Sequence, residues 1–434
     1  VVRKPLTTVQ NEYNRLVEKS KFDNLTNGDL NNWRMLSKPI QYNPVTVTQS
    51  GLTKEVANNI DNSFSGSSDT YIGNGYSYRI AYTASNYTRS DKLVFYDVLD
   101  NGSEDAATEW KGTFDRIDVR SIDTKLAYGI PGETAKPVVY YATTVPSELN
   151  VDDSSVWSTT MPADKSSIKA IAVDVRKTDG GHDFILDHGN SLSFYIYMKA
   201  PKDKSLDGKK AVNEVISNAR NFTGEQAGAG DQVLKYKAHS EITLHVPDLQ
   251  LNKESTPASG TEEAPTVIAN EKDTELTYRL KIKNNDTVLA ARDINVEDVI
   301  PEGLEVNKDD IRITSAALKL NNASLSNATG VGLTQSGQKL SFSVTLPKDA
   351  EMTITIPTKL KDKTIKTTVL KNTAKITKAE DIDLDVKSNT TYHKTIRTYE
   401  LNYVVNPDPN YGAPADSTTP AAVTELEYDT NQNL

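Results

Sequence analysis

Hydrophobic and polar residues alternate along most of the chain, which is the pattern of β-strands with one buried face. Clear examples, rich in Thr, Val, Ile and Tyr, are LSFYIYM (192–198), ITLHV (242–246), LTYRLKI (276–282), LSFSVTL (340–346) and MTITI (352–356). Helical spacing occurs near the start, where Val9, Tyr13, Leu16 and Val17 recur within TTVQNEYNRLVEKS. The pattern predicts an all-β protein of sandwich type with a short N-terminal helix.

The chain also contains an internal repeat. SYRIAY (77–82) matches TYRLKI (277–282) at an offset of 200 residues, and LVFYDVL (93–99) matches INVEDVI (294–300) at 201. Further on, LSFYIY (192–197) matches MTITIP (352–357) at an offset of only 160. The drop of about 41 residues predicts two homologous sandwiches, of which the first is enlarged by an insertion.

The repeat gives a domain plan. We expect an N-terminal segment with the helix at 1–50, an enlarged first sandwich at 51–248 with its insertion at about 100–185, and a second sandwich at 249–398. The Pro-rich tail at 399–434 is typical of a linker into a further, truncated module. A start at Val1 rather than Met is typical of a processed or excised fragment, so the absence of a signal peptide or wall anchor here says nothing about the full-length protein.

Composition narrows the possible functions. The formal charge is −10 and no basic tract stands out, which argues against nucleic acid as a partner. The sequence contains no cysteine, so disulfides and thiolate metal sites are excluded. No apolar stretch is long enough to span a bilayer, and the mean hydropathy is −0.53.

Strand alternation places polar residues on faces that should be buried, at matching positions of both copies. In the second copy these are Lys253, Asp298 and Asn372, and in the first copy Lys54, Asp97 and Asn213. Burying unpaired charges is costly. Three interpretations remain open from the residues alone: a buried Lys–Asp salt bridge capped by an Asn amide, an intramolecular isopeptide bond between Lys and Asn, or an inward placement that is wrong because the residues lie at strand ends. In the second case burial lowers the lysine pKa and raises the aspartate pKa, so that a neutral amine can attack.

A family resemblance bears on this choice. The segment from Thr277 to Val306, followed by LKNTAKI (370–376), is similar to the isopeptide-forming domains of Gram-positive fimbrial shaft proteins and collagen-adhesin-type surface proteins. The resemblance implies tandem immunoglobulin-like β-sandwich domains. It covers the second copy well and extends to the first through the internal repeat.

The resemblance also implies roles for the buried residues. In the family, a lysine on an early strand bonds to an asparagine on the last strand, and an acid on a middle strand assists. The bonds would join Lys253 to Asn372 and Lys54 to Asn213, assisted by Asp298 and Asp97. The family's DxxP context is intact in DVIP (298–301) but becomes DVLD (97–100) in the first copy, and NTA becomes NEV, so Asn218 stays a reserve candidate for Asn213.

Other candidate sites have plainer interpretations. The segment GGHDFILDHGN groups His182, Asp183, Asp187 and His188, but without a known ligand spacing, so a polar turn is the preferred interpretation. The acidic loop at 100–109 and NPDPNYG (406–412) lack the glycine and ligand pattern of a calcium loop. We therefore expect no metal and no cofactor.

Enzyme motifs are missing as well. The sequence has no nucleophile elbow, zincin motif, P-loop or dinucleotide fingerprint. The preferred function is a non-enzymatic adhesin or fimbrial-type stalk at the surface of a Gram-positive cell, anchored to the cell wall through segments outside this sequence. The alternative is a secreted glycan-active enzyme or its carbohydrate-binding module, which exposed carboxylates in a Tyr-lined cleft would favour.

Tyrosine is abundant, with 20 residues against 8 phenylalanines. Tyr140, Tyr141 and Trp157 in the insertion are candidates for binding a host or environmental surface protein or glycan, because loops on a rigid scaffold usually carry recognition. The sequence does not identify that ligand.

Overall fold

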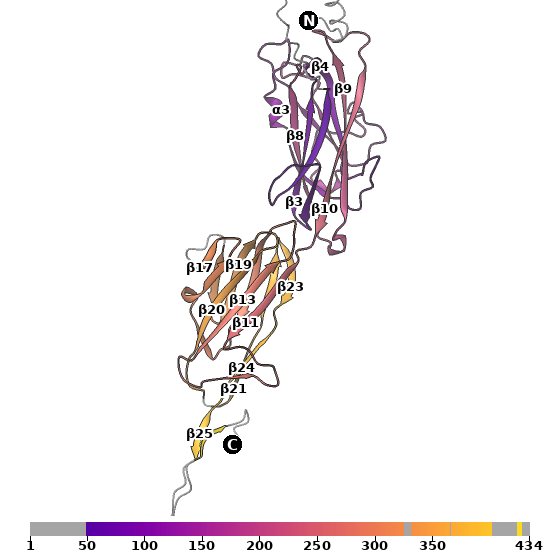
Figure 1. Cartoon of the computed structure of the whole chain (residues 1–434). Coiled ribbons are helices and arrows are strands. Elements are labelled where there is room, and N and C mark those ends of the chain that lie inside the picture. Colours follow the sequence, from indigo (N-terminus) through magenta and orange to yellow (C-terminus); the bar gives the residue numbers. More distant parts are fainter. Residues whose placement is uncertain (1–48, 325–330, 365, 402–422, 428–434) are drawn as a thin grey trace, which may run out of the picture. The chain divides into compact units, whose positions relative to one another are not determined.

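The computed structural model describes residues 49–324, 331–364, 366–401 and 423–427. Its named elements between residues 51 and 395 are almost entirely strands, which confirms the predicted all-β class (Figure 1). The predicted N-terminal helix and most of the Pro-rich tail lie outside the described residues.

The first group of strands forms two sheets, and we call it the first sandwich. One sheet has the order β1-β3-β8-β5 and the other β2-β10-β9-β4-β7-β6. The elements are β1 (Gly51–Asn58), β2 (Ser67–Tyr71), β3 (Gly75–Thr83), β4 (Arg89–Val98), β5 (Thr113–Asp118), α3 (Arg120–Asp123), β6 (Val138–Ala142), β7 (Ala170–Asp174), β8 (Ser191–Lys199), β9 (Lys210–Phe222) and β10 (Val233–His245).

The second group, which we call the second sandwich, has sheets of order β11-β13-β20-β16-β17, β18-β19-β14-β22-β23 and β12-β24-β21. Its strands are β11 (Leu249–Thr256), β12 (Thr266–Ile268), β13 (Glu275–Asn284), β14 (Ala291–Val299), β15 (Leu304–Val306), β16 (Arg312–Ser315), β17 (Leu320–Ser324), β18 (Gly332–Ser336), β19 (Lys339–Leu346), β20 (Glu351–Leu360), β21 (Thr368–Asn372), β22 (Ala374–Ala379), β23 (Ile382–Lys387) and β24 (Thr391–Thr395). Farther along, β25 (Thr398–Leu401) pairs with β26 (Val423–Glu427).

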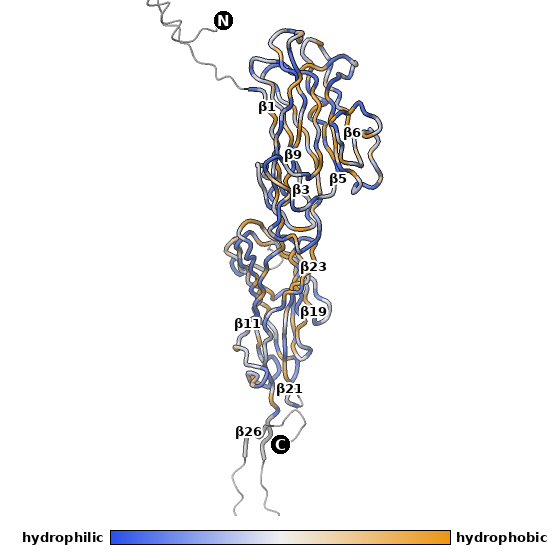
Figure 2. The backbone as a smooth tube through the Cα atoms, turned by 90° about the vertical axis from the view of Figure 1, so that its right-hand side faces the viewer, coloured by the Kyte–Doolittle hydropathy of each residue, from blue (hydrophilic) through white to orange (hydrophobic). Residues whose placement is uncertain are grey.

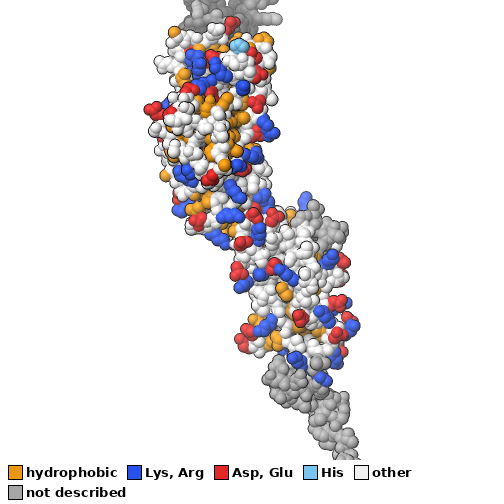
Figure 3. Space-filling view, turned by 180° about the vertical axis from the view of Figure 1, so that it is seen from behind, with side chains coloured by type: hydrophobic (Ala, Val, Ile, Leu, Met, Phe, Trp, Pro, Cys, Tyr) orange, Lys and Arg blue, Asp and Glu red, His pale blue; other side chains and the backbone are white. Residues whose placement is uncertain are grey.

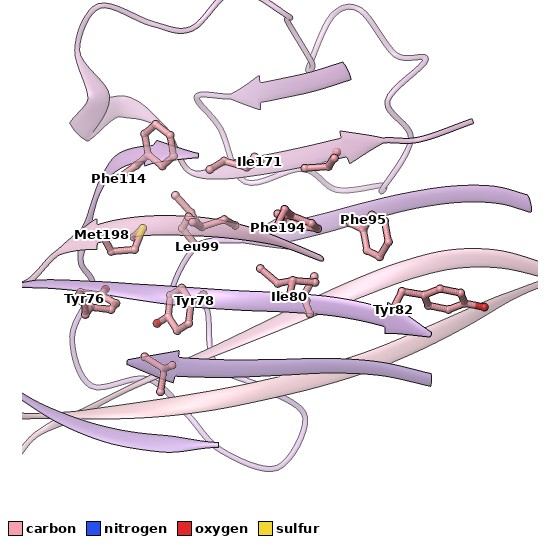
Figure 4. Packing of buried hydrophobic residues seen from close by; sticks show 14 of the residues in the cluster. Tyr76, Tyr78, Ile80, Tyr82, Phe95, Leu99, Phe114, Ile171, Phe194 and Met198 are labelled. Atoms are coloured by element: carbon pink, nitrogen blue, oxygen red, sulfur yellow. The ribbon is translucent and has the colours of Figure 1, made fainter. Parts of the chain in front are cut away.

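Strand alternation builds the cores. Along β3, the side chains of Tyr76, Tyr78, Ile80 and Tyr82 are all buried and point to the same side (Figure 4). Along β13 the buried positions again alternate with half-buried ones. Figure 2 shows hydrophobic positions recurring along the strands of both sandwiches. Burying one face of each strand stabilises the fold by about 25 cal/mol for every Å² of apolar surface removed from water.

The insertion of the first sandwich is more than a surface loop. It contains β5, α3, β6 and β7, and β7 is hydrogen-bonded between β4 and β6. Phe114 and Ile171, which it contributes, are buried in the main core beside Phe95 and Phe194 (Figure 4). The insertion therefore widens the sandwich itself, because its alternating strands supply both backbone pairing and core side chains. The exact domain limits stay a prediction.

Candidate functional site

The six polar residues predicted to face inward are all buried. Relative exposure is 3% for Lys54, 2% for Asp97 and 0% for Asn213, which we call the first cluster. It is 2% for Lys253, 0% for Asp298 and 2% for Asn372, the second cluster. Such burial of charged side chains requires partners inside the protein.

Each lysine is paired with the aspartate of its own cluster. Lys253 Nζ lies 2.6 Å from Asp298 Oδ2, and Lys54 Nζ is hydrogen-bonded to Asp97 Oδ2. Burial lowers the pKa of Lys253 to about 8, against the opposing effect of Asp298. Burial likewise lowers the pKa of Lys54, opposed first by Asp97. A lowered pKa increases the fraction of the lysine that is present as the neutral amine, which is the nucleophilic form.

The strand register gives both asparagines the same position relative to the acid. Asp298 on β14 pairs with Ala374 on β22, and Asn372 lies two residues before Ala374. Asp97 on β4 pairs with Val215 on β9, and Asn213 lies two residues before Val215. Because residues two apart on a strand share a face, Asn213 is the diagonal same-face neighbour of Asp97. Asn372 ends β21, one residue before β22 begins, and buried and exposed positions alternate through both strands, so Asn372 is on the inward side as Ala374 is. The structure thus pairs each lysine with its aspartate, and the strand register places the asparagine two residues before the aspartate's partner.

The amides of Asn213 and Asn372 are buried and make no hydrogen bond of normal geometry among the described residues. Asn372 lies near the Tyr278 hydroxyl and partly offsets the rise that burial causes in the Tyr278 pKa. The second carboxylate oxygen of each aspartate, Oδ1, is also without a hydrogen-bond partner among the described residues. An unsatisfied buried polar group costs about 1–3 kcal/mol, so such groups are rare in stable proteins. The reserve candidate Asn218 is only half-buried and differs in strand parity from Asn213, so its side chain does not share that face.

Tyrosines on β3 and β13 cover the lysines, and the sequence prediction missed them. Lys54 Nζ lies 4.3 Å from the ring centroid of Tyr78, and Lys253 Nζ lies 4.9 Å from that of Tyr278. A ring face attracts an ammonium and shields it from water. The internal repeat contained the signal, since both tyrosines occupy the same place in SYRIAY and TYRLKI.

Asn389 is a second residue that the sequence prediction missed. Its amide accepts a hydrogen bond from the backbone N–H of Lys253 at 2.8 Å and donates one to the Lys253 carbonyl at 2.7 Å. The two bonds hold the backbone of β11 where Lys253 enters the core. No pattern in the sequence marks this role, because the contact spans 136 residues.

One correction concerns the strand of the asparagine. The family resemblance placed it on the last strand, but Asn213 lies on β9, which is followed by β10, and Asn372 on β21 is followed by β22, β23 and β24. In the first sandwich β9 and β10 form one long antiparallel ladder from Val233 opposite Arg220 to Thr243 opposite Lys210. Force carried by a bond at Asn213 would therefore pass to the C-terminal end of the first sandwich through this ladder.

A second correction concerns the predicted ligand-binding residues. Trp157 is 3% exposed and packs in a small core with Tyr96 at 5.9 Å between ring centroids, so its ring is not presented to a ligand. Tyr140 and Tyr141 lie on β6 and are half-buried. In the segment 143–166 between β6 and β7, the apolar side chains of Val145 and Met161 are exposed, at 54% and 46%.

The histidine-rich segment takes part in surface pairs. His182 Nδ1 lies 2.8 Å from Glu133, Asp183 pairs with Lys177, and Asp187 accepts a hydrogen bond from Arg89. Among the described residues, no three His, Asp or Glu side chains are grouped so as to hold a metal ion. Within the same ranges, no helix has the length and apolar character needed to cross a membrane.

The surface itself mixes both signs of charge. In the face shown in Figure 3, Lys and Arg side chains are interspersed with Asp and Glu. A groove of the first sandwich is lined by Tyr128, Asp91 and Asp183, the combination that would favour a glycan-active site. However, Asp91 is paired with Arg220, and Asp183 with Lys177. Those two carboxylates are already engaged in ion pairs, and of the described carboxylates that line the groove only Glu225 is outside such a pair.

A comparison with solved structures gives matches at low sequence identity and low TM-score. The C-terminal domain of the Streptococcus pyogenes antigen I/II-family protein AspA is 10% identical, with a TM-score of 0.36, over 80% of this chain and 99% of that chain. BcpA, the major pilin subunit of Bacillus cereus, is 14% identical with a TM-score of 0.28, over 58% and 76%. The collagen adhesin of S. aureus is 12% identical with a TM-score of 0.24, over 80% and 92%.

No family model and no curated protein matches the sequence. The structural matches include an adhesin and a pilin, the kinds of protein that the sequence resembles. Because the TM-scores of these matches are below 0.5, the function proposed below is based on the geometry of the two clusters.

Proposed function

We propose that the chain is part of a non-enzymatic bacterial surface protein, an adhesin or pilus-type stalk, whose two sandwiches are each locked by an isopeptide bond. The bonds join Lys54 to Asn213 and Lys253 to Asn372. Asp97 and Asp298 each act once, during maturation. Attachment to a host or environmental surface and anchoring to a cell wall belong to the same proposal.

One observation carries it: in both clusters a buried asparagine amide without a hydrogen-bond partner precedes by two residues the strand partner of the aspartate in a buried Lys–Asp pair. A salt bridge capped by the amide would satisfy the amide, and the structure has no such hydrogen bond within its described residues. A covalent bond would remove the cost, because it consumes the lysine cation and expels the amide nitrogen as ammonia.

The chemistry follows from the positions. The lysine gives a proton to the aspartate, and the neutral amine attacks Cγ of the asparagine. The protonated aspartate polarises the amide carbonyl, since it can donate a hydrogen bond that a carboxylate cannot. The Cγ–Nδ2 bond then breaks and ammonia leaves, carrying the second proton lost by Nζ. The exclusion of water from the cluster protects the intermediate from hydrolysis.

The cross-link suits a protein under tension. In the first sandwich it would connect β1 in one sheet with β9 in the other, and in the second it would connect β11 with β21 of the three-stranded sheet. In the chain-entropy treatment of disulfides, closing loops of 119 and 159 residues stabilises each sandwich by about 5 kcal/mol. Unlike a disulfide, the amide cannot be reduced, and it requires no cysteine.

For surface recognition we propose the segment 143–166 with the neighbouring Tyr140 and Tyr141. Exposed apolar side chains beside aromatic residues are typical of protein-binding surfaces. The scaffold below is rigid, because β6 and β7 belong to the six-stranded sheet. Val145 and Met161 are the side chains that a partner would cover.

A flow assay tests both parts of this function. Beads coated with the chain are washed over surfaces coated with extracellular matrix, mucin or plasma proteins. We expect Val145→Ser with Met161→Ser to lower retention several-fold with and without flow, whereas Asn213→Ala lowers it under flow alone. Val299→Ser, an equally exposed position in the second sandwich, is the control. Retention that is unaffected by all of these variants would contradict the proposal.

A further inference from the structure

The first sandwich buries a carboxyl that the proposed cross-linking reaction does not use. Asp100 is fully buried and accepts hydrogen bonds from the Tyr76 hydroxyl at 3.0 Å, the Tyr78 hydroxyl at 2.7 Å and the Gly112 N–H at 2.7 Å. Figure 4 shows the two tyrosines side by side on β3. Gly112 permits this approach, because a Cβ there would collide with the Tyr76 hydroxyl.

Asp100 belongs to the first cluster by position. It follows Asp97 by three residues, where the second copy has Pro301 after Asp298. Its hydrogen-bond partner Tyr78 is the same ring that covers Lys54. The first cluster together with Asp100 therefore contains two carboxyls for one lysine, whereas the second cluster contains one carboxyl for one lysine.

Ionisable groups from four strands act on this site. They are Lys54 on β1, Tyr76 and Tyr78 on β3, Asp97 on β4 and Glu214 on β9. Burial raises the pKa of Asp100, its three hydrogen bonds oppose the shift, and the charge of Asp97 adds to it. Asp100 in turn favours the charged form of Lys54. While the ammonium is present, it offsets part of the negative charge.

We propose that formation of the first cross-link leaves Asp97 and Asp100 as a buried acid pair without a neighbouring cation and makes the first sandwich less stable as pH rises. This rests on the proposed cross-link. The reaction converts the Lys54 ammonium into a neutral amide, and the departing ammonia carries away the Nδ2 nitrogen of Asn213. Two carboxyls remain without that cation, and like charges in one buried site cannot both ionise cheaply.

The sign of the pH effect follows from proton binding. The unfolded chain releases the Asp100 proton near pH 4, the ordinary range of aspartate, whereas burial raises the pKa of Asp100 in the folded protein, so that its proton is retained to higher pH. Stability is therefore greatest below about pH 4 and falls as pH rises toward the raised pKa of Asp100. In the Asn213→Ala variant no cross-link forms, so the Lys54 ammonium persists. The stability of the first sandwich should then fall less as pH rises.

Tryptophan fluorescence can follow the first sandwich separately. Trp110 and Trp157 both lie in it, and Trp110 packs 5.7 Å from Tyr76. In a Trp33→Phe background, we expect the melting temperature to fall by about 5 °C or more between pH 5 and pH 8.

Asp100→Asn should at least halve this fall in melting temperature, and so should Asn213→Ala. Asn tolerates the positive φ of 45° found at Asp100, so the backbone is preserved. Asp115→Asn, at an exposed carboxyl, should leave the fall unchanged.

The outcomes separate this inference from the proposed function. If the mass shows that ammonia has been lost and the pH dependence is the same in wild type and Asp100→Asn, the acid pair is refuted while the cross-link stands. If no ammonia has been lost from the first sandwich, both fail. Should Asp100→Asn not fold, Tyr78→Phe serves instead: removing one hydrogen bond to Asp100 should move the fall in stability to higher pH, and an unmoved profile would overturn the inference.

Discussion

Pulled by residues 51 and 245, the first sandwich is expected to release only about 35 residues, or about 120 Å of contour length. The bond between Lys54 and Asn213 would hold the residues between them in a closed loop that tension cannot open. The residues free to extend are those before Lys54 and those after Asn213, chiefly β9 and β10. Single-molecule force spectroscopy measures this length directly.

Without the bond the same experiment should give a much longer extension. Asn213→Ala and Lys54→Ala each leave about 195 residues free, which corresponds to about 660 Å. Thr53→Ala, on the same strand but exposed, is the matched control and should extend like wild type. Equal extensions for wild type and Asn213→Ala would show that no covalent bond carries the load.

The position of Asn213 also predicts where the sandwich yields. Force from β1 would pass through the bond into β9, and from there across the ladder between β9 and β10. Those backbone hydrogen bonds, rather than the ones between β1 and β3, are then the first to break. The bond limits the extension but leaves this last hairpin sensitive to force.

In the second sandwich, Asn372→Ala is expected to lower the free energy of unfolding by about 5 kcal/mol, since it abolishes the closure of a 119-residue loop. For a domain of this size, that corresponds to a fall of about 10–20 °C in melting temperature. The buried pair of Lys253 and Asp298 is retained in this variant, so no unpaired charge is added. Calorimetry of the whole chain measures the transition.

Lys371→Ala is the control for this prediction. Lys371 precedes Asn372 on β21, but its side chain is exposed and pairs with Glu262 at the surface. Such exposed pairs contribute about 0–1 kcal/mol. If Asn372→Ala is no more destabilising than Lys371→Ala, the second cluster is a polar network and not a cross-link.

Much of the fold could be predicted from the sequence, because strand alternation and the internal repeat are local or periodic signals. The strand LTYRLKI became β13 and LSFSVTL became β19. The same parity placed Lys253, Asp298 and Asn372 on buried faces, and the structure buries all three. Two copies with the same arrangement made the prediction stronger than either alone.

The parts that sequence reasoning missed depend on tertiary packing. Trp157 was expected at a surface, but the insertion folds back on the sheet and buries it against Tyr96. Asp100 was visible only as a departure from DxxP, and its burial depends on β3 and Gly112. Asn389 contacts β11 from far along the chain. None of these contacts leaves a periodic signal.

The most direct test of the cross-links is the intact mass of the purified, denatured chain. We predict that the wild-type mass is lower than the sequence mass by two ammonia molecules, and that the double variant Lys54→Ala, Lys253→Ala shows no such deficit. A wild-type mass equal to the sequence mass would contradict the proposal and reduce both clusters to buried salt bridges.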